Sequence, residues 1–147
     1  MNALTKTYQP KGKQINRNWH LMDAADKTVG RLASEIAKIL QGKNKPDYSA
    51  HMDSGDYVVV LNSEKTIFTG KKEEQKIYFS HSLYPRGLKK VTASQLRVKD
   101  PSKILYNAIL HMLPKNRLQS QRIKRLKLVI GDVNPYLSQI NQNKNGN

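Results

Sequence analysis

The chain has 147 residues, and its 26 lysine and arginine residues outnumber its 11 aspartate and glutamate residues, which gives a net charge of +15 at pH 7. The absence of cysteine excludes disulfides, thiolate metal sites and a cysteine nucleophile, and no apolar run approaches the roughly 18 residues of a membrane helix. The length suits one domain with a hydrophobic core. Because the positive charges repel one another in a compact fold, a polyanionic partner is favoured, most simply a nucleic acid.

Residues 1–18 predict an extended basic arm. They carry four basic side chains and no acidic one, while Pro10 and Gly12 disfavour an amphipathic helix. They also lack the apolar core of a secretory signal, so we expect a soluble, cytoplasmic protein.

The next segment has the pattern of a strand followed by a helix. Residues 19–24 are a short apolar strand candidate, and residues 29–40 carry apolar side chains at helical spacing. Asp26 and Thr28 offer an N-cap, and Gly42 lies where a C-terminal cap glycine is expected.

A polar loop then leads into a β-branched run at residues 57–62, which suits a strand buried on both faces. A strand, a helix and a second strand in this order are typical of a parallel α/β sheet. Two further strand candidates are residues 65–70 and 76–81, and residues 83–90 are predicted to form a turn.

The second half contains another well-marked helix. Residues 92–96 are expected to form a short helix, and Asp100 and Pro101 then provide an N-cap and a first helical position. This longer helix is expected to end before Pro114.

The predicted domain ends with a basic helical segment at residues 115–125 and a final strand at 126–131. The organisation expected is therefore a basic arm (1–18), a single α/β domain (19–131) and an irregular polar C-terminal tail (132–147).

One loop could hold a catalytic or metal site. His51, Asp53 and Asp56 precede the buried strand, but the other histidines show no paired spacing, and aspartates before a strand are common turn residues. A structural or phosphate-facing loop is the favoured interpretation. The alternative is an α/β enzyme that handles phosphate or nucleotides with these residues and Asp23, although no glycine-rich phosphate loop is present.

Clusters of basic residues indicate the function more strongly than the loop with His51, Asp53 and Asp56 does. Residues 111–131 contain six basic residues and no acidic one, which favours phosphate neutralisation with release of counterions. Lysine acts mainly as a point charge, which favours recognition of the RNA backbone and shape over base reading. The predicted RNA-binding residues are Lys11, Lys13, Arg17, Arg31, Lys43, Lys45, His51, Lys71, Lys72, Arg86, Lys89, Lys90, Lys115, Arg117, Arg122, Lys124, Arg125 and Lys127.

Several motifs occur in a familiar order: "WHLMDAADKTVGRLASEIAKILQGKNKPDYSAHMDSGDYVVVLNSEKTIFTGKK", then "QKIYFSHSLYPRGLKK", "HMLPKNRL" and "RLKL". Together they resemble the bacterial-type large-subunit ribosomal protein L13 family over about residues 5–131. The resemblance implies a three-layer α/β/α domain around a mainly parallel four-stranded sheet, without enzymatic activity.

The resemblance also implies partners and a location. These are 23S-type rRNA, bound early in subunit assembly, and neighbouring large-subunit proteins. The expected location is the cytoplasmic ribosome, with an organellar ribosome as the alternative. No cofactor, metal, membrane, small-molecule substrate or homo-oligomer is expected. The aspartates of the 51–56 motif are expected to fix the loop and to orient Lys43, Lys45 and His51 toward RNA.

Overall fold

The computed structural model describes residues 15–144, so the first fourteen residues of the predicted arm, with Lys11 and Lys13, lie outside the described residues. The described elements are, in chain order, β1 (Trp19–Asp23), α1 (Val29–Gln41), β2 (Tyr57–Leu61), the 3₁₀ turn η2 (Ser63–Lys65), α2 (Lys72–Gln75), β3 (Ile77–His81), β4 (Leu88–Thr92), α3 (Ala93–Lys99), α4 (Pro101–Met112), α5 (Gln119–Lys124), β5 (Leu126–Leu128) and α6 (Leu137–Lys144).

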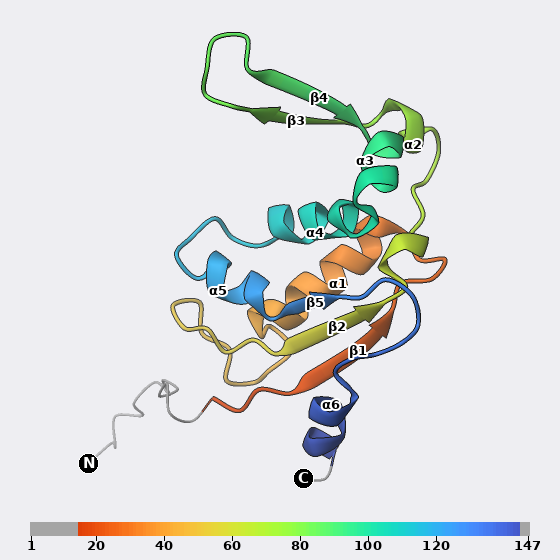
Figure 1. Cartoon of the computed structure of the whole chain (residues 1–147). Helices are drawn as coiled ribbons and strands as arrows, with labels where there is room; N and C mark the ends of the chain where they lie inside the picture. Colours follow the sequence, from red (N-terminus) through yellow and green to blue (C-terminus); the bar gives the residue numbers. More distant parts are fainter. Residues whose placement is uncertain (1–14, 145–147) are drawn as a thin grey trace, which may run out of the picture.

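The centre of the fold is a parallel sheet in the order β1-β2-β5, as predicted for the first strands (Figure 1). Val58, Val59 and Val60 of β2 are completely buried, which confirms a strand covered on both faces. Helices α1 and α4 contribute the other main part of the core, and their buried side chains form one cluster with those of β2.

Helix α1 follows the sequence pattern closely. Its apolar positions, including Leu32, Ile36 and Leu40, are buried because they recur on one face of the helix. Thr28 is the N-cap residue, and Gly42 ends the helix with a φ of 79°, a conformation that glycine adopts at little cost. Helix α4 likewise starts at Pro101 after Asp100, as predicted.

The described sheet has three parallel strands where four were expected. The predicted strand at 65–70 does not form, because the chain turns away from β2 at Asn62, whose φ is 52°, and enters η2. Only Ile67 returns, in a single parallel bridge to Thr28.

Strands β3 and β4 form a separate antiparallel hairpin, paired from Ile77 with Thr92 to His81 with Leu88. The expected turn at 83–90 was therefore partly wrong, since its last residues belong to β4. Figure 1 shows the hairpin extending away from the body, with α2 and α3 at its base. At its tip, Leu83 and Arg86 have positive φ angles.

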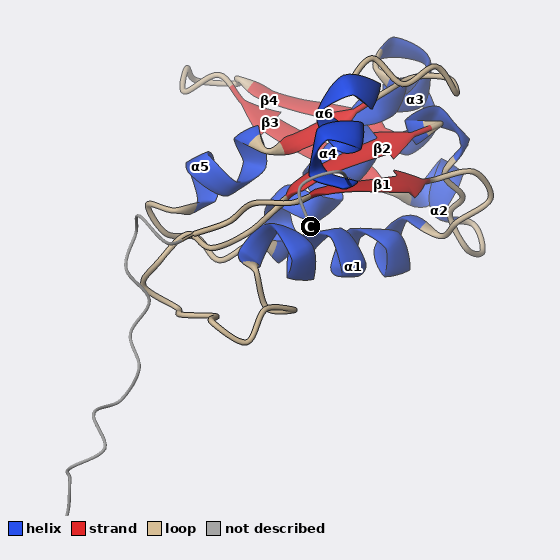
Figure 2. Ribbon diagram, turned by 90° about the horizontal axis from the view of Figure 1, so that it is seen from below, coloured by secondary structure: helices blue, strands red, loops and turns tan. Residues whose placement is uncertain are grey.

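The C-terminal tail is not wholly irregular, contrary to the prediction, because it contains α6 beside β1 (Figures 1 and 2). Ile140 of this helix is buried. The Trp19 ring stacks with both Tyr57 and Tyr136, whose ring centroids lie 4.4 and 5.9 Å away. Trp19 is thus half-buried in an aromatic stack at this contact and does not belong to the central cluster.

Candidate nucleic-acid interface

Asp53 gathers three arginines from distant parts of the chain. Arg125 binds its carboxylate in a bidentate way, with Nη2 2.6 Å from Oδ1 and Nη1 on Oδ2. Arg122 Nε lies 3.5 Å from Oδ1, and Arg17 Nη2 lies 3.9 Å from Oδ2. The carboxylate therefore connects the root of the arm, the loop before β2 and the basic segment around α5.

The two arginines near α5 are largely enclosed. Arg122 is 2% exposed and Arg125 is 6% exposed. Their remaining contacts go to backbone carbonyls, from Arg122 to Met52 and from Arg125 to Leu40. Their guanidinium groups are thus buried and bound to protein oxygens, and RNA contact by Arg122 and Arg125 stays a prediction.

Gly55 permits this close packing. A Cβ atom at Gly55 would lie 1.9 Å from the carbonyl oxygen of Leu40, the same oxygen that accepts from Arg125. Any side chain would push the loop away from the end of α1. The glycine in the motif is therefore required by the close approach of two backbone segments.

Asp56 holds a second group of donors. Its carboxylate accepts from the Asn18 backbone amide and His20 Nε2, each at 3.0 Å, and from Lys45 Nζ at 2.5 Å. Burial of the carboxyl opposes its ionisation, but the hydrogen bonds from His20, Lys45 and the Asn18 amide outweigh this and lower the pKa of Asp56 below its ordinary value of 3.8. Lys45 also donates to the Asn16 carbonyl, so its ammonium group is turned toward the arm.

Acid should remove the contribution of Asp56 to stability. Since its folded-state pKa is lowered, the contribution is complete above about pH 3.8 and disappears as the pH falls through the folded-state pKa. Asp56→Asn should lose about 1–3 kcal/mol at pH 7 through weaker charge-assisted hydrogen bonds, and its stability should fall less steeply below pH 4. Urea unfolding at pH 7 and at a series of acidic pH values measures both effects; an unchanged acid dependence would contradict this role.

The expected orientation of loop residues toward RNA changes accordingly. Asp53 and Asp56 do fix the loop backbone and the arm root, but Lys45 and Arg17 are held by these carboxylates. Lys43 and His51 are exposed. The alternative use of His51 with Asp53 and Asp56 as one ligand set lacks the required geometry, because no group of three or more potential ligands is brought together among residues 15–144.

Most of the other predicted RNA-binding residues lie on the surface. The exposed ones are Arg31, Lys43, His51, Lys71, Lys72, Arg86, Lys89, Lys90, Lys115, Arg117 and Lys124, while Lys127 is half-buried. The α1–β2 loop, α5 and the hairpin tip lie toward the same end of the molecule (Figures 1 and 2). Lys71 and Lys72 lie apart from them, at α2.

The hairpin adds features that the sequence reading missed. Phe79, Leu83 and Tyr84 are 62%, 92% and 75% exposed, and they accompany the cations of the hairpin. Lys90 Nζ lies 5.8 Å from the centre of the Phe79 ring. The signal available in the sequence was the mixture of aromatic and apolar residues with lysine and arginine over residues 77–92.

None of the helices within the described part of the chain is long and apolar enough to cross a membrane.

The family model of ribosomal protein L13 matches residues 17–135. Among curated proteins, the large ribosomal subunit protein uL13 of Dictyoglomus thermophilum is 48% identical over 134 residues, covering 91% of this chain and 94% of its own length. The protein of the same name from Natranaerobius thermophilus is 49% identical over 133 residues, with 90% and 93% covered. That of Geobacter sp. strain M21 is 44% identical over 140 residues, with 95% and 99% covered.

Proposed function

Since this chain belongs to the ribosomal protein L13 family, we propose that it acts as a structural constituent of the large ribosomal subunit and binds 23S-type rRNA through its exposed cations. The family is structural and not catalytic. The ribosome, in the cytoplasm for bacterial-type relatives, is its place of action.

The observation that carries this proposal is the family match from residue 17 to residue 135. That range includes Asp53, Asp56 and the described basic residues that we proposed to contact RNA. The net charge of +15 supports the same partner, because each phosphate neutralised by a side chain releases counterions.

The geometry supports two separate roles for the cations, one group holding the fold together and the other binding RNA. Buried Arg122 and Arg125, with Arg17 and Lys45, attach the arm root and loop to the body through Asp53 and Asp56. The exposed lysines and arginines are then presented on a rigid support, so fewer loop conformations must be ordered when RNA binds.

Three finer points belong to the same proposal. The chain joins the subunit early in assembly, it acts as a single copy, and it contacts neighbouring ribosomal proteins as well as 23S-type rRNA.

The arm residues Lys11 and Lys13 contribute to RNA binding. The exposed apolar residues of the hairpin supply contact area where cations alone give little shape recognition.

Sedimentation tests the proposal. The intact tagged chain, expressed in bacteria, should migrate with the large subunit in a sucrose gradient at low salt and leave it in high salt, because phosphate contacts weaken as salt rises. A tagged chain of similar size and charge that is not ribosomal serves as the control. Migration at the top of the gradient at low salt, or with the small subunit, would contradict the proposal.

A further inference from the structure

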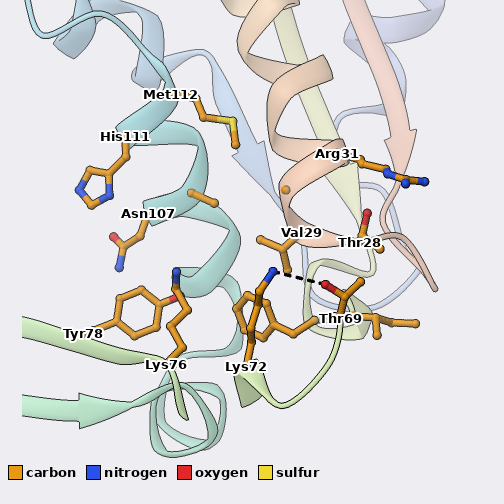
Figure 3. A pocket seen from close by; sticks show the side chains of 14 residues that line it. Thr28, Val29, Arg31, Thr69, Lys72, Lys76, Tyr78, Asn107, His111 and Met112 are labelled. Atoms are coloured by element: carbon orange, nitrogen blue, oxygen red, sulfur yellow. Dashed lines mark hydrogen bonds between the residues drawn. The ribbon is translucent and has the colours of Figure 1, made fainter. Parts of the chain in front are cut away.

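A cavity of about 720 Å³ lies apart from the aspartate clusters. Its walls are the first turn of α1, residues 67–69, α2 with the residues that follow it, and α4. Figure 3 shows Lys72 and Lys76 on one side, with Asn107 and His111 on the wall formed by α4. The volume lies within the range of about 300–1,000 Å³ usual for small-ligand pockets.

The polar side chains of the cavity favour an anion. None of its fourteen lining residues is acidic, whereas Arg31, Lys72 and Lys76 are cationic. Lys72 and Lys76 are exposed and form no ion pair with the described residues. Lys72 Nζ donates only a long hydrogen bond, 3.3 Å, to Thr69 Oγ1. Lys76 Nζ lies 5.5 Å from the centre of the Tyr78 ring, a cation–π contact. Neither ammonium group is neutralised by a described carboxylate, so both can bind a phosphate.

The remaining walls suit a flat apolar group. Val29, Phe68, Ala108 and Met112 line the cavity together with the Tyr78 ring. Such a surface accepts a nucleobase, because every base has a π-face that packs on aromatic or apolar side chains.

Two polar side chains can form hydrogen bonds with the edge of that base. The Asn107 amide offers both donors and an acceptor. Burial of Tyr78, together with the nearby Glu73 carboxylate, raises the pKa of its phenol above the ordinary value of 10.0 in spite of Arg97. The phenol is thus protonated at neutral pH and can donate a hydrogen bond.

We propose that this cavity receives one unpaired nucleotide of rRNA, with its base between the Tyr78 and α4 walls and its phosphate on Lys72 and Lys76. The proposal rests on the proposed function and adds a defined nucleotide site to it. A protein segment is the less suitable occupant, since it would need acidic groups at the position of both lysines while filling an apolar cavity.

Site-directed crosslinking identifies the occupant. The intact chain carrying p-benzoylphenylalanine in place of Tyr78 is assembled into large subunits and irradiated, and the rRNA is mapped by primer extension. We expect a stop at one or a few neighbouring unpaired nucleotides. Met112, which is 42% exposed at the cavity wall, is a second attachment position that disturbs packing little.

The possible outcomes separate the two proposals. Subunits that contain the chain but yield only protein crosslinks, or no RNA crosslink from either position, would overturn the nucleotide site and leave the proposed function standing. A wild-type chain that does not enter large subunits would overturn both.

A charge variant gives an independent measurement. Lys72→Glu/Lys76→Glu should bind large-subunit rRNA at least about tenfold more weakly than Lys65→Glu/Lys99→Glu, an exposed pair with the same change in charge. Equal affinities of the two variants would count against the site.

Discussion

Asp53→Ala should destabilise the fold by about 3–5 kcal/mol, because removing one partner of a buried ion pair leaves an uncompensated buried charge. Here two nearly enclosed guanidinium groups, those of Arg122 and Arg125, would lose their carboxylate together. Arg17 would also lose its ion pair, while its hydrogen bond to the Asp53 backbone carbonyl would remain. Urea unfolding followed by circular dichroism measures the change in the free energy of unfolding.

Asp47→Ala is the matched control for this substitution. Asp47 is an exposed aspartate of the same loop and takes part in no described ion pair, so its replacement should change stability by less than about 0.5 kcal/mol. The stability of Asp53→Asn should lie between those of Asp53→Ala and Asp47→Ala, since the amide keeps one acceptor oxygen. Equal stabilities of Asp53→Ala and Asp47→Ala would show that the arginine cluster does not support the fold.

Replacing the exposed cations Lys115, Arg117 and Lys124 by alanine should weaken RNA binding and leave the stability of the fold unchanged. Their side chains lie on the surface around α5, so we expect the triple variant to unfold like the wild type. Its affinity for large-subunit rRNA should fall by at least about tenfold at low salt, because up to three phosphate contacts are lost. Filter binding at a fixed salt concentration measures the affinity.

A second triple variant provides the control. Lys38, Lys65 and Lys99 are exposed lysines outside the proposed interface, and their replacement by alanine removes the same charge. This control should lose clearly less affinity. If the two triple variants bind RNA equally weakly, overall charge and not the proposed surface determines binding.

The sequence predicted those elements whose side chains face the core. Helix α1 shows a regular apolar face with a glycine cap, and β2 is a continuous β-branched run, so burial is visible in the residue order itself. The hairpin is different. Leu88, Lys89 and Lys90 of β4 are exposed, so no core-facing alternation marks the strand, and its pairing with β3 becomes evident only in the fold.

The basic residues illustrate a second limit of prediction from the sequence. Arg122, Lys124 and Arg125 are close in sequence and look alike as phosphate ligands, yet only Lys124 is exposed. What separates them is Asp53, which lies 72 residues before Arg125. Local composition cannot indicate which cations have an intramolecular carboxylate. The cavity beside α4 also combines residues from distant segments, so it was not predictable from spacing.

The most direct test of the account is the salt dependence of binding between the intact chain and large-subunit rRNA. The logarithm of the association constant should fall linearly with the logarithm of salt concentration, with a slope of about −0.7 to −0.9 for each phosphate contacted and hence a total corresponding to several contacts. An affinity that does not change with salt would contradict RNA binding through the exposed cations.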